Sequence, residues 1–313
     1  MRAPWPWFGS KVTPAPMIWE RFGDAPNFVD PCCGSLGAVL NRPHPPGVET
    51  LNDADGLLAN AWRAMVAAPE AVARFADFHV SEIDLTARHL WLVERRAALT
   101  ACLMADPDFY DAQAAGWWIW GACAWIGTGW CSGEGPWRLE DGVLVKDTKG
   151  GGVNKQLPHL SAEQGINRID GRGDRHAFIL DWFRRIQARL RDARITCGDW
   201  RRVVTPVVTW RHGVTGILFD PPYDGGNVDY SSGGRGIAQD IAEWCRDNGN
   251  DSRLRICLCG HDGDYDLPGW EQVPWKGRGG YGNQGGDDAD DNRHREMLWF
   301  SPKCLRNNQV SIF

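Results

Sequence analysis

Two strand–turn–helix units follow each other near the N-terminus, and they constrain the fold of this chain more than any other feature. The first, "NFVDPCCGSLGAVLNRP" (27–43), begins with a short apolar strand, turns at Asp30-Pro31 and enters a small-residue stretch that can start a helix. The second, "VETLNDADGLLANAWRAM" (48–65), has a strand, an acidic turn and then an apolar helix face. Consecutive units of this kind predict a parallel sheet with right-handed crossovers, and therefore an α/β fold.

The same alternation returns towards the C-terminus. A helix is predicted for "HAFILDWFRRIQARL" and another near 237–247, with strands at "RITCGD", at 214–219 and at "RLRICLCG". The apolar segments "GWEQVPW" and "REMLWFSP" predict a C-terminal antiparallel hairpin.

The middle of the chain has a different pattern. A helix from about Ser81 to Met104 opens with a capping box at Ser81 and Asp84, and a tryptophan-rich segment and a glycine- and lysine-rich stretch without clear period follow it. We therefore predict an α/β domain made of residues 1–74 and 173–313, with residues 75–172 inserted as a second, mainly helical lobe.

Composition excludes several classes of protein. With 43% hydrophobic and 24% charged residues, the 313-residue chain is globular and neither disordered nor fibrous. The net charge of -6 argues against general nucleic-acid affinity, although binding needs only a local basic patch. The seven arginines between 184 and 202 are interpreted as a solvated helix face.

Cysteine and hydropathy patterns give further exclusions. The ten cysteines are spread thinly, form no CxxC pair and follow no secretory signal, which predicts reduced thiols in the cytoplasm and no metal site. The uncharged segment 112–133 carries five glycines and is interpreted as a buried helix running into a loop, not as a membrane span. The tryptophans of this segment (Trp117, Trp118, Trp120 and Trp125) are assigned mainly to core packing.

Four features are expected at one edge of the sheet, because each follows a predicted parallel strand. They are Asp30-Pro31 with Gly34 and Gly37, then Asp53, then Gly198-Asp199-Trp200, and finally "DPPY" at 220–223. Ligands bind at the carboxyl edge of such sheets, where glycines admit a ligand to the backbone and an acid after the second strand accepts hydrogen bonds from ribose hydroxyls. Because GxGxxG is absent, these features predict a nucleoside-containing cofactor that is not obviously a dinucleotide.

The fourth feature also suggests chemistry. Two successive prolines break a sheet ladder and force the chain into a rigid, extended bend. The Asp220 carboxylate, the Pro221 carbonyl and the Tyr223 ring are therefore held in fixed relation at the end of a buried strand.

At this point the sequence resembles a known family, the Dam-type DNA adenine N6-methyltransferases, particularly those carried by phages and prophages. The motifs that carry the resemblance are "PWFGSK" (6–11), "FVDPCCGSLGAVL" (28–40), "LNDAD" (51–55), "CGDW" (197–200) and "DPPY". The match extends over nearly the whole chain and is weakest in the insert. The sequence departs from the family at Cys32, where a phenylalanine often lies on the cofactor, and at Leu36, where a second glycine is usual.

The resemblance implies a Rossmann-like methyltransferase fold with a mostly parallel seven-stranded sheet and an inserted target-recognition lobe. It implies transfer of a methyl group from S-adenosylmethionine to the N6 amine of a flipped-out adenine in double-stranded DNA, without a metal. The catalytic residues it implies are Asp220, Pro221, Pro222 and Tyr223. The cofactor-binding residues it implies are Trp7, Phe8, Gly9, Lys11, Asp30, Pro31, Cys32, Gly34, Ser35, Asp53, Asp199, Trp200 and Asp220. A monomer or weak dimer in the cytoplasm of a bacterial host cell is expected, with a possible cognate restriction endonuclease and no membrane partner.

Several alternatives remain open. The same fold serves cytosine-N4 and RNA adenine methyltransferases, and a catalytically silent DNA-binding relative would keep the fold without turnover. A nicotinamide oxidoreductase is disfavoured by the missing dinucleotide fingerprint. Asp199 could either bind the cofactor's adenine amine or cap a short helix that begins at Trp200.

Overall fold

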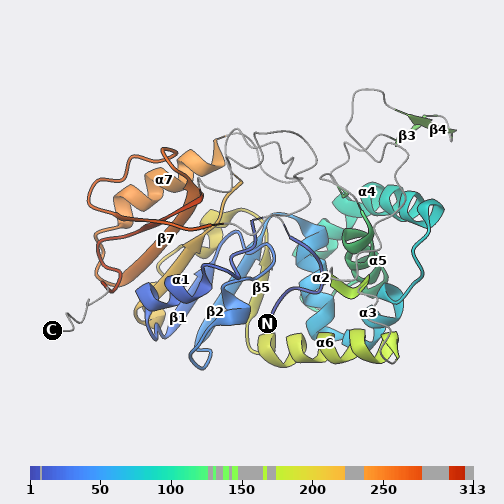
Figure 1. Ribbon diagram of the computed structural model, residues 1–313, viewed down its shortest axis with the longest axis horizontal. Helices are drawn as coiled ribbons and strands as arrows, with labels where there is room; N and C mark the ends of the chain where they lie inside the picture. The colour runs from blue at the N-terminus through green and yellow to red at the C-terminus, as the bar shows by residue number, and fades with distance from the viewer. Residues whose placement is uncertain are drawn as a thin grey trace.

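A computed structural model of the protein describes residues 1–7, 9–125, 130–131, 137–140, 143–146, 165–167, 174–222, 236–276 and 296–306. Within these residues, one mixed sheet has the strand order β5-β2-β1-β6-β7-β9-β8 (Figure 1). Its strands are β1 (Asn27–Asp30), β2 (Val48–Asp53), β5 (Arg194–Cys197), β6 (Thr215–Phe219), β7 (Leu254–His261), β8 (Glu271–Pro274) and β9 (Glu296–Phe300).

The sheet is mostly parallel. β5, β2, β1, β6 and β7 pair in parallel, and β9 runs antiparallel to both β7 and β8. The predicted α/β class, the mostly parallel seven-stranded sheet and the C-terminal antiparallel hairpin are therefore confirmed, and the architecture is compatible with a Rossmann-like fold.

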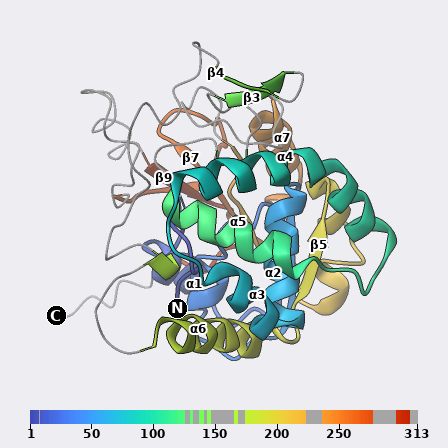
Figure 2. The same cartoon turned by 90° about the vertical axis from the view of Figure 1, so that its right-hand side faces the viewer.

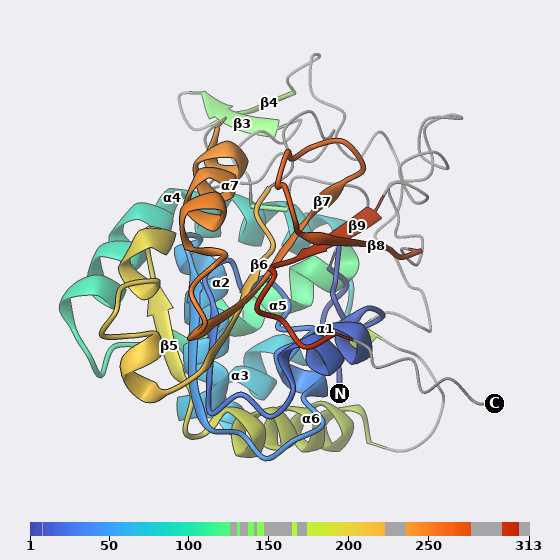
Figure 3. The same cartoon turned by 90° about the vertical axis from the view of Figure 1, so that its left-hand side faces the viewer.

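Each face of the sheet is covered by helices, because alternate strand residues point to opposite faces. Ile217 and Phe219 of β6 belong to a core with α7 (Ile237–Asn248) and the 3₁₀ turn η3 (Trp200–Val203). Leu218 belongs to the core on the other face, which includes α1 (Ala15–Phe22). Figure 3 shows α7 and α1 on opposite sides of the sheet.

The helices of the predicted insert pack against the α/β part. They are α4 (Glu82–Ala105) and α5 (Ala112–Ala124), and both contact α2 (Gly56–Ala67) (Figure 2). α5 also contacts α3 (Pro69–Ala76), which spans the predicted boundary at residue 74 and contacts α6 (Arg175–Leu190). The Ser81 side chain accepts a hydrogen bond from the Asp84 amide at 3.4 Å, as the predicted cap requires. Trp118 and Trp120 are buried and Trp117 and Trp125 are packed against the same core, which confirms the core assignment of these rings.

Two local expectations differ from the structure. The small-residue stretch after β1 starts no α-helix and forms only the 3₁₀ turn η1 (Val39–Asn41), because prolines at 43, 45 and 46 stop any longer helix. Within the stretch without clear period, β3 (Trp137–Glu140) and β4 (Val143–Lys146) form a separate antiparallel pair. The remaining short elements are the 3₁₀ turns η2 (Gly165–Asn167) and η4 (Trp210–His212).

The arginine-rich segment divides between surface and interior. Arg184 and Arg185 lie on an exposed face of α6 and pair with Glu70 and Asp181, as expected of a solvated helix face. Arg189 points inward and bonds to the buried Glu49. Local sequence cannot distinguish these cases, because the inward position becomes apparent only when α6 lies on the sheet.

All ten cysteines are free thiols, and eight of them are buried. Burial raises the pKa of thiols such as Cys131 and Cys245 well above the ordinary value, so the thiolate is disfavoured. Among the described helices, none combines the length and the apolar character that crossing a bilayer requires.

Candidate active site

The ends of four neighbouring parallel strands bring the predicted motifs together. In the sheet β5, β2, β1 and β6 lie side by side, so the residues that follow them meet at one edge. The chain also changes direction across the sheet here, since β2 and β5 lie on one side of β1 while β6 and β7 lie on the other. Open α/β sheets bind ligands at such a reversal, outside the carboxyl ends of the central strands.

Asn52, which lies in the LNDAD motif but was assigned no role from the sequence, links three of these strand ends. Its amide nitrogen donates to the Pro31 carbonyl at 2.9 Å and to the Gly198 carbonyl at 2.8 Å. Its amide oxygen lies 2.9 Å from the Thr196 hydroxyl, and its side chain is buried. A buried asparagine at the end of a strand is a weak sequence signal, and only the tertiary structure shows that it aligns the loops after β1, β2 and β5.

Asp53 is oriented by backbone donors on both sides. One carboxylate oxygen accepts from the Gly34 amide at 3.1 Å, and the other accepts from the Asp55 amide at 2.9 Å. Burial raises the pKa of Asp53 to about 6 against these hydrogen bonds, which lower it. The carboxylate is thus fixed beside the first-strand turn, with acceptor capacity left for a ligand hydroxyl.

The N-terminal motif packs on the turn after β1. Gly34 has φ +47°, and a Cβ there would lie 2.8 Å from the Trp7 ring nitrogen. A Cβ at Gly37 would lie 2.8 Å from the Lys11 amide nitrogen, so the two backbones approach closely. The Ser35 hydroxyl lies 2.9 Å from the Ser10 hydroxyl. Two motifs that the sequence separates by a helix and a strand therefore pack together at this edge of the sheet.

Leu36 occupies the position where the family usually has a second glycine, and the structure shows how the turn accommodates it. It has φ +54°, a left-handed conformation that costs an L-residue roughly 1–2 kcal/mol. Its side chain is only 1% exposed and belongs to the core with α1 and α2. Full burial of a leucine stabilises the fold by about 1.5–3 kcal/mol, which offsets the backbone strain.

Lys11 and Asp220 form a close, mostly buried ion pair at this edge of the sheet. The Lys11 ammonium lies 2.6 Å from Asp220 Oδ1 and donates to the Gly9 carbonyl at 2.7 Å. The Lys11 side chain is 4% exposed and that of Asp220 is 22% exposed. Burial alone would lower the pKa of Lys11, but the negative charge of Asp220 and its neighbours more than offsets it and raises the pKa. Lys11 is therefore charged, and one oxygen of Asp220 is turned towards it.

Asp30 adds a third carboxyl group to this region. It is 3% exposed, and its Oδ1 is buried with no hydrogen-bond partner in the described structure. Burial, followed by the charges of Asp220 and Asp53, raises the pKa of Asp30 well above the ordinary value. Lys11 opposes this effect only in part. An excess of acidic groups with an unused buried acceptor favours a ligand that carries positive charge and N–H donors.

Asp199 and Trp200 take the structural roles that the sequence left open. The Asp199 carboxylate caps η3 by accepting from the Arg201 amide at 2.8 Å, and it also pairs with the Arg201 guanidinium at 3.2 Å. Trp200 is buried against Phe219 and Trp244 in edge-on contacts. The capping alternative for Asp199 is confirmed, whereas its contact with a cofactor stays a prediction.

The remaining predicted site residues differ in burial, and two of them lie outside the described part of the chain. Pro31 is buried and Cys32 is partly buried beside the acids, where burial raises the pKa of the Cys32 thiol. Pro221 is buried and Pro222 is partly exposed, directly after Asp220. Phe8 and Tyr223 lie outside the described residues.

Comparison with known proteins assigns no family. No protein-family model matches the chain, and a search of curated proteins finds no match. Among the described side chains, no cluster of three or more histidine, cysteine or acidic residues is arranged to hold a metal ion.

Proposed function

We propose that this protein is an S-adenosylmethionine-dependent DNA methyltransferase of the Dam type, which methylates the N6 amine of adenine. One observation supports the proposal: the carboxylate that precedes the double proline lies at the same edge of the sheet as Asp53 and the first-strand turn. The charges of Asp220 and Asp53 both act on Asp30, as expected if the methyl donor and the methyl acceptor bind next to each other.

The residues at this edge of the sheet fit the cofactor. Asp53 would accept the ribose hydroxyls, while Asp30, with its unpaired buried oxygen, would face the cofactor's cationic end. Gly34 has no side chain, which lets the Trp7 ring pack on the turn beside Asp53. When bound, S-adenosylmethionine supplies an electrophilic methyl group on a positively charged sulfonium. Asp30, Asp53 and Asp220 contribute three carboxyl groups and Lys11 contributes one ammonium. This excess of acidic groups favours binding of the cationic cofactor over the neutral product left after transfer.

Asp220 and Pro221 would bind the target amine. The exocyclic amine of adenine is a poor nucleophile because its lone pair is delocalised into the ring. If the Asp220 carboxylate and the Pro221 carbonyl accept its two N–H bonds, they localise that lone pair and aim it at the methyl group. The base must leave the duplex to reach them, which costs a few kcal/mol of stacking and pairing. Tyr223 is proposed to stack on the flipped base.

The direct test is methyl transfer by purified protein. Unmethylated double-stranded DNA incubated with methyl-labelled S-adenosylmethionine should yield N6-methyladenine when its nucleosides are separated by mass spectrometry. Formation of N4-methylcytosine would instead identify a cytosine-N4 methyltransferase of the same fold. Label found in RNA alone would identify an RNA adenine methyltransferase of that fold. Absence of transfer to either nucleic acid would overturn the proposal. Binding of DNA and cofactor without transfer would then identify the catalytically silent relative.

Asp220→Asn is the matched variant for this assay. Asparagine keeps the shape and can still accept a hydrogen bond from Lys11, but it removes the charge that should act on the amine. We expect a fall in kcat of about 10²–10³-fold, the effect of losing one group that stabilises transition-state charge. Glu243→Gln, the same chemical change at an exposed position of α7, should leave the rate unchanged. Retained activity in Asp220→Asn would contradict the assigned role.

A further inference from the structure

Glu296 lies at the candidate site, although no sequence motif included it. It is the first residue of β9 and pairs in register with His261, the last residue of β7. Because β9 is antiparallel to β7, its first residue is at the edge where the parallel strands end. The Glu296 side chain is buried, with 8% of the residue exposed. A carboxylate that β9 brings from the C-terminal part of the chain therefore lies at the same edge as Asp220.

Trp275 connects Glu296 with Lys11. The Trp275 backbone amide donates to the Glu296 carbonyl at 3.0 Å, and the Lys11 ammonium lies 5.7 Å from the centre of the Trp275 ring. The Trp275 ring is buried, so it excludes water from one side of the ammonium. The negative charge of Glu296 also acts on Lys11, after burial, Asp220 and Cys259 in order of size. The charges of two carboxylates thus act on Lys11, one from Asp220 directly after β6 and one from Glu296 of β9.

In the proposed methyl transfer, Asp220 must both pair with Lys11 and hold the target amine. The Lys11 ammonium is 4% exposed and needs a carboxylate, because an unpaired buried charge is strongly destabilising. Asp220 supplies that carboxylate at 2.6 Å. The target amine must also be held by Asp220, and a charge-assisted hydrogen bond to Lys11 reduces the electron density that Asp220 can direct to the amine. A second carboxylate near Lys11 would relieve this competition.

We propose that Glu296 is a positioning residue, which shares the charge of Lys11 with Asp220 and holds the ammonium while Asp220 accepts the target amine. The role rests on the proposed methyltransferase function. Glu296 does not touch the substrate in this arrangement and acts only through Lys11. Its effect should therefore disappear when Lys11 carries no charge.

The test is a double-mutant cycle between Glu296→Gln and Lys11→Met, measured as single-turnover methyl transfer to unmethylated DNA. Glu296→Gln alone should lower the transfer rate by about 10- to 100-fold, the effect of losing a hydrogen bond to a charged group, with the KM for DNA unchanged. Glu296→Asp keeps the charge and should recover most of the rate. In the Lys11→Met background, Glu296→Gln should change the rate by less than about twofold, since coupled residues are not additive.

A thermal cycle on the same four proteins separates this inference from the proposed function. Glu296→Gln should lower the melting temperature in the presence of Lys11 and lower it less in the Lys11→Met protein, where the charge on which Glu296 acts is absent. The role of Glu296 would be overturned if the double variant lost activity by the product of the two single-variant factors. It would also be overturned if Glu296→Gln lowered the melting temperature by the same amount in both backgrounds. A wild-type protein without methyl transfer would overturn the proposed function and the role of Glu296 in it, while the thermal cycle would still report whether Lys11 and Glu296 interact.

Discussion

At the scale of single residues, Asp53 shows how one carboxyl group serves binding and opposes stability. Its two backbone donors, the amides of Gly34 and Asp55, favour the ionised form. Burial has the larger effect and raises its pKa from 3.8 to about 6. The folded protein therefore holds a proton on Asp53 between about pH 4 and 6, where the unfolded chain has released it. The stability from this proton is present at acidic pH and is lost as the pH rises through 6.

Cofactor affinity should depend on pH with the opposite sign. Ribose hydroxyls donate to the ionised carboxylate, so the affinity for S-adenosylmethionine should fall as the pH falls through 6. With a pKa of about 6, the ionised fraction falls by about tenfold between pH 7.5 and 5.0, and the affinity should fall with it. Calorimetric titration across this range checks the slope. Asp53→Asn should bind more weakly and without this slope, whereas an unchanged slope in the variant would assign the titration to another group, such as Asp30.

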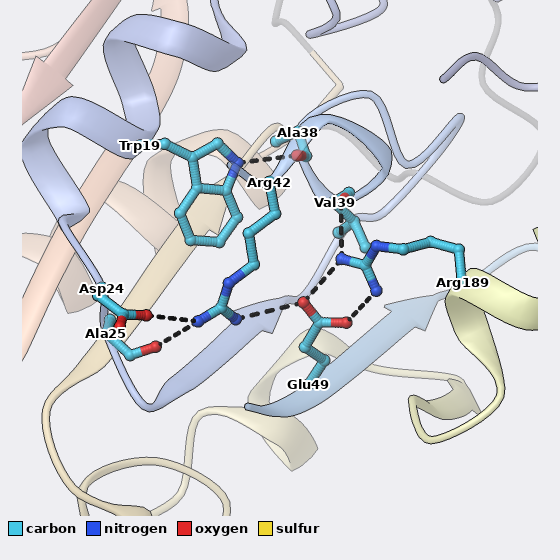
Figure 4. A network of polar contacts seen from close by, with 8 residues as sticks. All are labelled: Trp19, Asp24, Ala25, Ala38, Val39, Arg42, Glu49 and Arg189. Atoms are coloured by element: carbon cyan, nitrogen blue, oxygen red, sulfur yellow. Dashed lines mark hydrogen bonds and ion pairs between the residues drawn. The ribbon is translucent and has the colours of Figure 1, made fainter. Parts of the chain in front are cut away.

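At the scale of elements, a buried ionic network joins α6 to β2 (Figure 4). Arg189 of α6 donates to both oxygens of Glu49 at 2.8 and 2.9 Å, and also to the Val39 carbonyl at 2.7 Å. Arg42 reaches the same carboxylate at 3.3 Å and packs over the Trp19 ring. Glu49 is 2% exposed and lies near the start of β2, away from the strand end that carries Asp53. The network therefore fixes the helix that returns the chain from residues 75–172 to the sheet.

Glu49→Gln should destabilise the fold strongly. The substitution leaves two guanidinium groups without their shared carboxylate, and breaking a buried ion pair costs about 3–5 kcal/mol. Glu70→Gln is the matched control, because Glu70 pairs with Arg184 on the same helix but is 57% exposed. It should cost less than about 1 kcal/mol. Urea unfolding of both variants measures the difference, and equal losses would mean that the buried network contributes no more than a surface pair.

At the scale of the whole molecule, the described helices of the predicted insert share a core with one face of the sheet. Ile119 and Trp120 of α5 belong to the same apolar cluster as Phe28 of β1 and Leu218 of β6. Figure 2 shows α5 flanked by α2, α3 and α4, with no separate layer between these helices and the α/β part. Continuous packing of this kind favours unfolding of the described helices and the sheet in one transition.

Ile119→Ala tests this continuity. The side chain is fully buried, and its truncation should cost about 2–5 kcal/mol. If unfolding is cooperative, hydrogen exchange of the slow β6 amides should accelerate by the same free energy as that of the α5 amides. Faster exchange confined to α4 and α5 would instead identify an insert that unfolds independently of the sheet.

Local sequence patterns predicted the helices and strands, and also the edge of the sheet at which the candidate site residues lie. The alternation of apolar strands and amphipathic helices predicted the parallel sheet, and Ser81 and Asp84 predicted the start of α4. Asp30, Asp53 and Asp220 were expected at one edge because each follows a parallel strand, and the structure places all three there. These features are readable because side-chain periodicity and helix capping act over a few residues.

The partners within the site were decided by tertiary structure alone. Nothing near Lys11 in the sequence indicates that it pairs with Asp220, nor that the charge of Glu296 from β9 acts on it. Asn52 gained its role only when β1 and β5 lay on either side of β2. Hydrophobic burial, which drives collapse, has no direction and does not select polar partners. Those partners are selected afterwards, because each polar group that packing buries must find a hydrogen bond or an opposite charge among the residues the fold has brought close.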